Sequence, residues 1–364
     1  MEIGIVGLPN VGKSTLFNAL AKAQALASNY PFCTIEPNIA VVEVKDERLD
    51  VLAQIVKPKK VTHPLLKFVD IAGRARGAHK GEGLGNLFLS HIRNVDAIAH
   101  TVRCFEDASV IHVEGPIDPR RDIEIIESEL FLSDIEIVDR RIAKISNTAK
   151  SGDEHARKEI AFLAPLREAL NKGKRFADPE SLDHEIEGFF ADLRLLSSKP
   201  VLFCANVDED LAGENAKRWV AEVETIARER GAVVIPICAR LESEIADLPP
   251  EEGAAMLKEM GFEESAIDRF VRACYDLLEV VTFFTIKGEE TRGWTVRRGT
   301  GLRDAAGKIH TDMYDKFICA EVISLDEFKQ AGNMSHAREK GLVRTEGKSY
   351  KVRDGEIVLV KFGK

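Results

Sequence analysis

The sequence predicts an α/β domain that is interrupted by a pair of long helices and followed by a smaller α+β domain. Strand-like apolar runs alternate with amphipathic helical patterns from Ile3 to about residue 118, which is typical of a parallel sheet. The alternation stops for a charged helical stretch and resumes at Val201. After Leu278 the chain changes to short β-type runs, which indicates a separate C-terminal domain.

The elements of the α/β domain follow from the apolar pattern. Short apolar runs predict strands that are buried on both faces, and runs with three- and four-residue spacings predict helices. We expect strands at 3–6, 39–44, 65–70, 97–104, 201–206 and 233–238, and helices at 16–21, 84–93, 214–229 and 264–278.

The interruption predicts an antiparallel coiled coil. Apolar residues recur at three- and four-residue spacings over 122–150, and a polar turn at 147–153 separates this helix from a second apolar series over 160–170. Pro165 and Gly173 are expected to kink or end the second helix. Such a hairpin is either a solvated scaffold or a partner-docking arm, and its pattern alone does not distinguish the two.

The last 85 residues predict an α+β module of the half-barrel or ubiquitin-like type. Strands are expected at 280–286, 317–323 and 357–360, with a helix at 302–310. The predicted domains are therefore an α/β domain in two parts, 1–121 and 199–279, a helical insertion, 122–198, and the C-terminal module, 280–364.

Composition indicates an ordinary soluble protein, since 30% of the 364 residues are charged and 45% are hydrophobic. No apolar run approaches the roughly 20 residues that cross a bilayer, and the first residues lack a signal-peptide profile, so we expect a cytoplasmic protein with no membrane partner. The six cysteines form no C-x-x-C pair, which argues against a disulfide framework or a zinc site.

Charge is unevenly distributed along the chain. The net charge of −9 argues against diffuse nucleic-acid binding and against a DNA partner. From Val280 onward, however, 16 Lys+Arg stand against 12 Asp+Glu, which makes this part +4 and the preceding part −13. The C-terminal module is thus the expected polyanion contact, although an excess of this size also fits a plain soluble surface.

The octapeptide from Gly7 to Ser14, G-L-P-N-V-G-K-S, matches the phosphate-binding loop pattern G-x-x-x-x-G-K-[ST] between an apolar strand and a helix. Backbone N–H groups of such a loop surround a phosphate, and the helix that follows adds its positive N-terminal dipole. Lys13 adds a point charge, so it is also a candidate catalytic residue, and Ser14 would ligate Mg²⁺. Candidate nucleotide contacts here are Asn10, Val11, Gly12, Lys13, Ser14 and Thr15.

Two further motifs indicate a nucleotide-controlled switch. Asp70 to Gly73 has the form D-x-x-G at the end of an apolar strand, where the aspartate serves Mg²⁺ and the Gly73 N–H meets the γ-phosphate. Thr34 lies between the phosphate loop and the second strand, where switch proteins place a threonine that caps Mg²⁺. The predicted metal ligands are Ser14, Thr34 and Asp70. A metabolic kinase is disfavoured because no acceptor-binding lid is evident.

These motifs resemble the YchF subfamily of Obg-related P-loop NTPases. The resemblance rests on residues 7–15, 30–38, 70–78 and 80–86, and it extends through the whole chain. The insertion resembles the coiled-coil domain of that family and the C-terminal module its TGS domain, with matching pieces at 292–296 and 299–300. The resemblance implies ATP hydrolysis and association with the ribosome, on its large subunit and rRNA, through the TGS and coiled-coil domains.

The base-reading motif departs from that of GTPases. GTPases carry N-K-x-D, whose aspartate accepts hydrogen bonds from guanine, whereas this chain has Asn206-Val207-Asp208-Glu209. Loss of guanine readout is therefore expected, and the N-x-x-E form resembles the family and favours ATP; a GTPase that tolerates the change stays an alternative. Expected base contacts are Asn206, Val207 and Glu209, with Cys238 and Ala239 from a motif normally written S-A-K.

The residue that handles the hydrolytic water is not evident. Arg74 stands where Ras-type enzymes have a glutamine, and it either reaches the γ-phosphate as an arginine finger or is solvated. Water could instead be positioned by His112 or His79, of which the resemblance favours His112. If none of them acts, the chain is a nucleotide-binding scaffold. We expect slow hydrolysis without a partner.

Three narrower expectations remain. Asn10 matches loop asparagines that coordinate K⁺ in related NTPases, so K⁺ is a further candidate cofactor. Oxidation of Cys33 would disturb the neighbouring Mg²⁺ cap, although the position is more simply explained by a tolerated small residue. The expected rRNA contacts of the basic module are Arg292, Arg297, Arg298 and Arg303.

Overall fold

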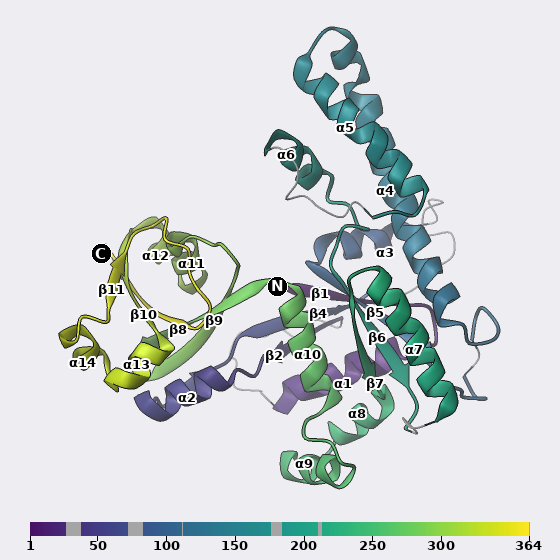
Figure 1. The fold of residues 1–364 in the computed structure, drawn as a ribbon. Helices are drawn as coiled ribbons and strands as arrows, with labels where there is room; N and C mark the ends of the chain where they lie inside the picture. The colour runs from purple at the N-terminus through teal and green to yellow at the C-terminus, as the bar shows by residue number, and fades with distance from the viewer. Residues whose placement is uncertain (27–37, 72–82, 111, 176–183, 210–212, 364) are drawn as a thin grey trace. The chain divides into compact units, whose positions relative to one another are not determined.

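The chain forms two compact units in a computed structural model that describes residues 1–26, 38–71, 83–110, 112–175, 184–209 and 213–363 (Figure 1). The first unit comprises Met1–Ala40 and Lys67–Ala273, and the second comprises Val41–Leu66 and Cys274–Lys364. The sequence prediction had left 41–66 in the α/β domain. In the structure this segment instead belongs with the C-terminal module.

The first unit is built on a sheet with strand order β2-β4-β1-β5-β6-β7. Every pairing whose register is resolved, from β4 through β1, β5 and β6 to β7, is parallel, as the sequence predicted. Strands β5 and β6 are buried along their whole length, because helices cover both faces of a parallel sheet. The strands are β1 (Glu2–Val6), β2 (Ile39–Glu43), β4 (Leu65–Asp70), β5 (Ala97–Cys104), β6 (Val201–Val207) and β7 (Val233–Ile237).

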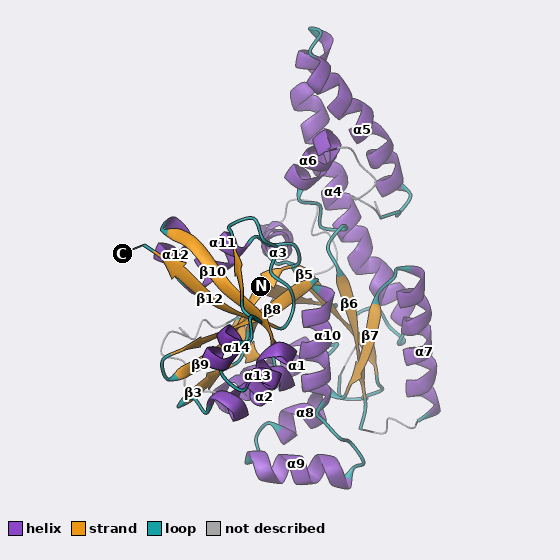
Figure 2. Cartoon of the chain, turned by 60° about the vertical axis from the view of Figure 1, so that its left-hand side comes forward, coloured by secondary structure: helices purple, strands orange, loops and turns teal. Residues whose placement is uncertain are grey.

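Helices pack on this sheet through one large apolar core. Side chains of α3, of the beginning of α4 and of α7 meet those of β5 and β6 there, and Lys22 of α1 donates to Ser243 and Asp247 at α8. Figure 2 shows these helices around the sheet. The helices are α1 (Lys13–Leu26), α3 (Gly83–Asn94), α7 (Glu214–Glu229), α8 (Ala239–Ile245), α9 (Pro250–Glu259) and α10 (Ala266–Leu277).

The insertion is a helical hairpin that extends away from the sheet (Figures 1 and 2). Helix α4 (Pro119–Lys150) starts three residues before the predicted boundary, because Asp118 caps it and Pro119 fits its first turn. Its first turns pack on the sheet, and the remainder packs against α5 (Glu154–Asn171) and α6 (His184–Leu193). Helix α5 continues through Pro165 and ends just before Gly173, whose φ is 65°.

The second unit is a mixed sheet with strand order β11-β10-β12-β8-β9-β3. Strand β3 pairs in parallel with β9, and helix α2 buries Leu49 and Leu52 against Phe284 and Ile323. These contacts explain why 41–66 belongs here. The strands are β3 (Lys60–Thr62), β8 (Val280–Lys287), β9 (Glu290–Arg297), β10 (Phe317–Ser324), β11 (Arg344–Glu346) and β12 (Glu356–Phe362), and the helices are α2 (Glu47–Val56), α11 (Leu302–Ile309), α12 (Thr311–Asp315), α13 (Leu325–Ala331) and α14 (Met334–Glu339).

Within the ranges given above, none of the helices combines the length and the apolar character that a membrane span requires.

Candidate nucleotide-binding site

The loop between β1 and α1 has a backbone that its two glycines make possible. Gly7 has a φ of 154° and Gly12 a φ of 95°, both in the range that side chains rarely adopt. A Cβ on Gly12 would lie 2.0 Å from Nδ2 of Asn206, and one on Gly7 would lie 2.5 Å from the Thr101 carbonyl oxygen. Asn10, at the tip of the loop, is also left-handed, with a φ of 61°. The loop therefore needs glycine at both positions.

Lys13 and Asp70 form a partly dehydrated pair of opposite charges beneath this loop. Lys13 Nζ donates to the Leu8 carbonyl at 2.7 Å, and burial lowers the pKa of Lys13 to about 8 although the charge of Asp70 opposes this. Burial likewise raises the pKa of Asp70, while the charge of Lys13 lowers it. Both groups are thus held in an environment that favours a new charged partner.

The oxygen atoms at this place fit a hard divalent cation. Asp70 Oδ1 is buried and has no hydrogen-bond partner among the described residues. Ser14, in the first turn of α1, is exposed. Strands β1 and β4 pair in parallel with Ile5 opposite Asp70, so the loop and the carboxylate leave the same edge of the sheet. Magnesium prefers such oxygen ligands, and an orphaned carboxylate oxygen is what it would satisfy.

Asn206, at the end of β6, joins two parts of the candidate site. Its Nδ2 donates to the Val11 carbonyl at 2.9 Å, and its Oδ1 accepts from the Ala239 N–H at 3.1 Å. The phosphate loop and the start of α8 are thereby held together through one buried amide. Cys238, predicted as a base contact, is buried at the N-cap of α8, where its side chain makes no capping hydrogen bond.

Glu209 lies at the end of the same strand, with its carboxylate turned toward α8. Its Oε1 is 3.6 Å from Nε of Arg240, and both side chains are exposed. Val207 is buried. The aspartate with which a GTPase binds guanine is therefore replaced by the longer Glu209, whose carboxylate faces Arg240.

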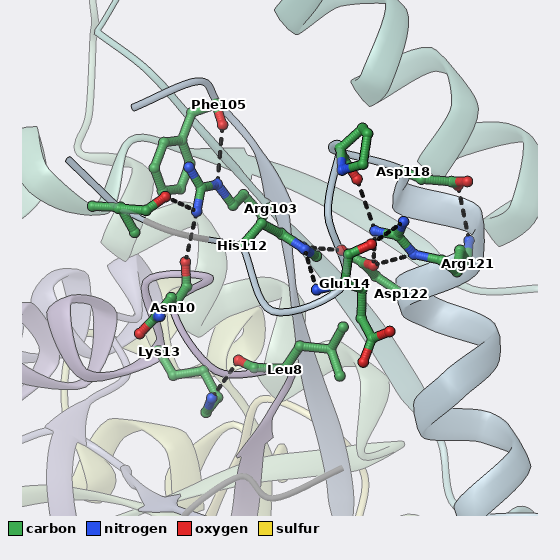
Figure 3. Close-up of polar contacts among 12 residues, drawn as sticks. Leu8, Asn10, Lys13, Arg103, Phe105, His112, Glu114, Asp118, Arg121 and Asp122 are labelled. Carbon is green, nitrogen blue, oxygen red and sulfur yellow. Dashed lines mark hydrogen bonds and ion pairs between the residues drawn. The ribbon is translucent and has the colours of Figure 1, made fainter. Parts of the chain in front are cut away.

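Arg103 is a functional candidate that the sequence reasoning missed. Its guanidinium is buried between the phosphate loop and the segment after β5, and its hydrogen-bond partners among the described residues are carbonyl oxygens (Figure 3). Burial lowers the pKa of Arg103, which no directly bonded carboxylate compensates among the described residues. The signal that could have revealed it is a charged residue inside the apolar strand β5. The accepting carbonyls are those of Phe105 at 3.1 Å, Val110 at 3.0 Å, Asn10 at 3.4 Å and Asp107 at 3.4 Å.

Both ring nitrogens of His112 have partners. Its Nε2 lies 2.7 Å from Oδ2 of Asp122, and its Nδ1 accepts the Glu114 N–H at 3.1 Å (Figure 3). The neutral ring therefore carries its proton on Nε2, and both nitrogens are engaged. With these two partners the ring anchors the loop to α4, and the role of His112 in positioning water stays a prediction.

Several predicted residues lie outside the described residues, namely Thr34, Cys33, Gly73, Arg74 and His79. Their assigned roles stay predictions. The structure brings together the remaining candidates from the loop, β4, β6 and α8. No cluster of three or more metal-ligating His, Cys, Asp or Glu side chains occurs in the described ranges.

A parallel sheet, a glycine-dependent phosphate loop with a buried lysine, and an aspartate on the neighbouring strand define a P-loop NTPase. A family model described as a 50S ribosome-binding GTPase matches residues 2–146. The YchF-GTPase C-terminal model, described as a protein of unknown function, matches residues 280–363.

Similarity to known proteins covers the whole chain. The Ribosome-binding ATPase YchF of Bacillus subtilis is 46% identical over 363 residues, which are 100% of this chain and 99% of that protein. The Obg-like ATPase 1 of Oryza sativa is 42% identical, covering 100% of this chain and 92% of that protein. A solved structure of the Schizosaccharomyces pombe YchF GTPase matches with a TM-score of 0.88 and 34% identity over 99% of this chain and 97% of that one. The chain belongs to the YchF family, as its motifs predicted.

Proposed function

We propose that this protein is a Mg²⁺-dependent ATPase that acts as a nucleotide-controlled switch on the ribosome. The observation that carries the proposal is that Lys13 is buried beneath the phosphate loop near Asp70, whose Oδ1 is buried without a hydrogen-bond partner among the described residues. A dehydrated lysine is stabilised by a phosphate, and an unsatisfied carboxylate oxygen by a hydrated cation. Relatives named ATPases support hydrolysis as the reaction.

The residues of this chain have distinct roles in the proposal. Loop N–H groups and the N-terminus of α1 bind the phosphates, and Lys13 exchanges the Leu8 carbonyl for a phosphate oxygen. Ser14, Thr34 and Asp70 hold Mg²⁺, which when bound neutralises phosphate charge. Arg74 or His112 remains the proposed aid to hydrolysis, and Asn10 the proposed K⁺ ligand. Nucleotide contacts are proposed for Asn10, Val11, Gly12, Lys13, Ser14, Thr15, Gly73, Asn206, Val207, Glu209, Cys238 and Ala239.

Adenine is the proposed base. The carboxylate of Glu209 faces Arg240, so it does not offer guanine the acceptor that N-K-x-D provides. We expect the double substitution Val207→Lys with Glu209→Asp to shift the ratio of ATP to GTP affinity toward GTP. The matched control is Glu244→Asp, an exposed acid that also pairs with Arg240 and should leave the ratio unchanged.

Ribosome association rests on the comparisons. The B. subtilis relative is named a ribosome-binding ATPase, and the matched family model is described as a 50S ribosome-binding GTPase. We propose the large subunit and its rRNA as the partner, engaged through the C-terminal module, of TGS type, and the coiled-coil hairpin, with the cytoplasm as the place of action. The basic excess of the C-terminal module supports a contact with RNA.

A GTPase is the second candidate, because the similar S. pombe protein is described as a GTPase. Titration of ATP and GTP against the Mg²⁺-bound protein, with phosphate release followed with and without purified ribosomes, decides between them. Tighter ATP binding with turnover raised by ribosomes supports the proposal, whereas preference for GTP overturns it. Binding without release in either condition indicates a nucleotide-binding scaffold. Asp70→Asn should reduce Mg²⁺-dependent release while ATP binding in EDTA persists.

A further inference from the structure

The second unit contains a cleft of about 460 Å³ at one end of its sheet. The start of β8, the turn after β9 and the segment before β12 form its walls. Two buried side chains in its lining, Val281 and Val352, are apolar. A concave site of this size with an apolar floor is within the range that accommodates a nucleotide-sized ligand.

The rim of this cleft is positively charged. Arg298, Lys351 and Arg353 line it, and none of the three side chains forms an ion pair with another described residue. The carboxylate in the lining, that of Asp354, is already engaged: one oxygen lies 2.5 Å from Arg48 Nη1, and the other accepts the Thr282 N–H at 2.8 Å. The cleft therefore offers three cations to an anionic ligand and no unpaired acid.

An aromatic ring stands beside these cations in a fixed position. The Tyr350 hydroxyl donates to Glu356 Oε1 at 2.6 Å. The same carboxylate accepts from Arg344 at 2.8 Å and from the Arg353 N–H at 2.9 Å. Three donors on Glu356 hold the carboxylate, and through it the ring. The guanidinium groups of Arg344 and Arg353 also lie near the ring, 5.6 and 6.0 Å from its centroid. Little conformational entropy is therefore lost if a flat ligand stacks beside them on Tyr350.

We propose that this cleft binds a nucleotide of single-stranded RNA, with the base on Tyr350 and the flanking phosphates on Arg298, Lys351 and Arg353. Aromatic stacking beside a positive groove is how proteins bind unpaired RNA. The apolar floor favours a base over an acidic peptide, which would use the cations but not the ring. The proposal rests on the ribosome association proposed above and assigns it a specific RNA contact.

This assignment refines the four arginines expected from the sequence. Arg298 lines the cleft, whereas Arg292 lies over Trp294, 4.0 Å from the ring, and Arg303 lies over Tyr314 at 4.3 Å. Lys351 and Arg353, which the sequence did not single out, are brought to Arg298 by the fold.

The test measures binding of a fluorescein-labelled eight-nucleotide single-stranded RNA to the full chain by anisotropy between 50 and 300 mM salt. The variant replaces Arg298, Lys351 and Arg353 with Gln, and the matched control replaces Lys308, Lys329 and Lys340, which are exposed on the same unit outside the cleft lining. The cleft variant should bind about tenfold more weakly or worse, with a salt slope lower by about two for three lost phosphate contacts. Equal losses in the variant and in the control would overturn the proposal.

Substitutions of Tyr350 and competition measurements identify the ligand. Tyr350→Leu should weaken binding by about tenfold without changing the salt slope, and Tyr350→Phe, which keeps the ring but loses its hydrogen bond to Glu356, should weaken binding less. A mononucleotide that competes as strongly as the RNA would show a free-nucleotide site instead, and poly-glutamate that competes better would show an acidic-peptide site. Either result overturns the proposal.

Ribosome co-sedimentation separates this proposal from the proposed function. If the wild type sediments with ribosomes and the cleft variant does so equally well, the cleft assignment fails while the function stands. If the wild type does not sediment with ribosomes in any nucleotide state, but the cleft variant and not its control binds the RNA more weakly, the proposed function is wrong and the RNA-binding cleft is supported.

Discussion

Two buried cations accompany the phosphate loop, and they are satisfied in different ways. Lys13 has one carbonyl partner and an oppositely charged neighbour in Asp70, so its charge is available to a ligand. Arg103 is fully committed to four carbonyl oxygens and holds the backbone of the loop in place. The first residue is therefore suited to bind phosphate, and the second to position the residues that do.

The lowered pKa of Lys13 predicts how the stability of the nucleotide-free protein depends on pH. Between pH 8 and pH 10.5 the unfolded chain still holds this proton while the folded chain has released it, so stability rises with pH relative to a Lys13→Met variant. The full difference is about 3 kcal/mol, at 1.36 kcal/mol for each unit of pKa. Urea unfolding of both proteins at pH 7.5 and pH 10.5 measures it. Exposed Lys308→Met is the control; a wild type that keeps a constant margin over Lys13→Met at both pH values would contradict the prediction.

Arg103 should control nucleotide affinity without touching the nucleotide. Arg103→Met removes the donors that hold the Asn10 and Val110 carbonyls, and hydrogen bonds from a charged group contribute about 1.5–3 kcal/mol each. We expect ADP affinity to fall about tenfold or more, which calorimetric titration measures. Arg230→Met is the matched control, since it removes a partly buried arginine that pairs with Glu127 of α4. It should reduce stability and leave ADP affinity unchanged; equal losses of affinity in both variants would disprove the assignment.

Elements that the sequence predicted well are those whose signals are local. The strands at 65–70 and 97–104 were predicted with their observed bounds, and so was the helix at 214–229. The phosphate loop is equally local, since strand, glycines and lysine follow one another within a dozen residues. Elements that depend on distant partners were missed: β3 has three residues, and it is a strand because β9 lies beside it.

In the candidate site, too, local motifs could be predicted from the sequence, whereas contacts between distant elements could not. Asn206 was predicted near the nucleotide from its motif, but its role in joining Val11 to Ala239 depends on a parallel sheet that brings distant residues together. His112 was named as a candidate for positioning water, and its contact with Asp122 on α4 became visible only in the fold. Contacts between side chains of separate elements cannot be inferred from residue spacing or composition.

The helical hairpin should melt without loss of the nucleotide site. Leu163 is fully buried between α4, α5 and α6, so Leu163→Ala should destabilise the hairpin by about 2–5 kcal/mol. The base of α4 is held separately, by Ile123, Ile126 and Leu130 in the core of the sheet. Limited proteolysis should cleave within 140–171, while ADP affinity stays at the wild-type value. Leu132→Ala, on the exposed side of α4, should change neither; a matching loss of ADP affinity in Leu163→Ala would show that hairpin and site form one cooperative unit.

At the scale of the whole molecule, each of the two units is formed by two separate segments of the chain. After β2 the chain leaves the first sheet, forms α2 and β3 in the second unit, and returns as β4. The C-terminal module therefore cannot complete its fold from its own residues, because Leu49 and Leu52 belong to its core and β3 closes its sheet edge at β9. A fragment obtained by cutting the chain only at residue 279 would therefore lack part of this core or its partners, and we do not expect it to be stable.

Because each unit contains two separate segments, the structure predicts which truncated forms of the chain will fold. A fragment that ends at Leu278 should keep α2 without its apolar partners, and Leu49 and Leu52, both fully buried in the intact chain, would be exposed. We expect this fragment to bind a hydrophobic dye and to aggregate. The Val44 N–H donates to the Pro64 carbonyl at 2.8 Å, so a short glycine-serine turn can replace 45–63. The fragment with this replacement should be monomeric in size-exclusion chromatography and bind ADP, and if both fragments behaved alike, α2 and β3 would not depend on the C-terminal module.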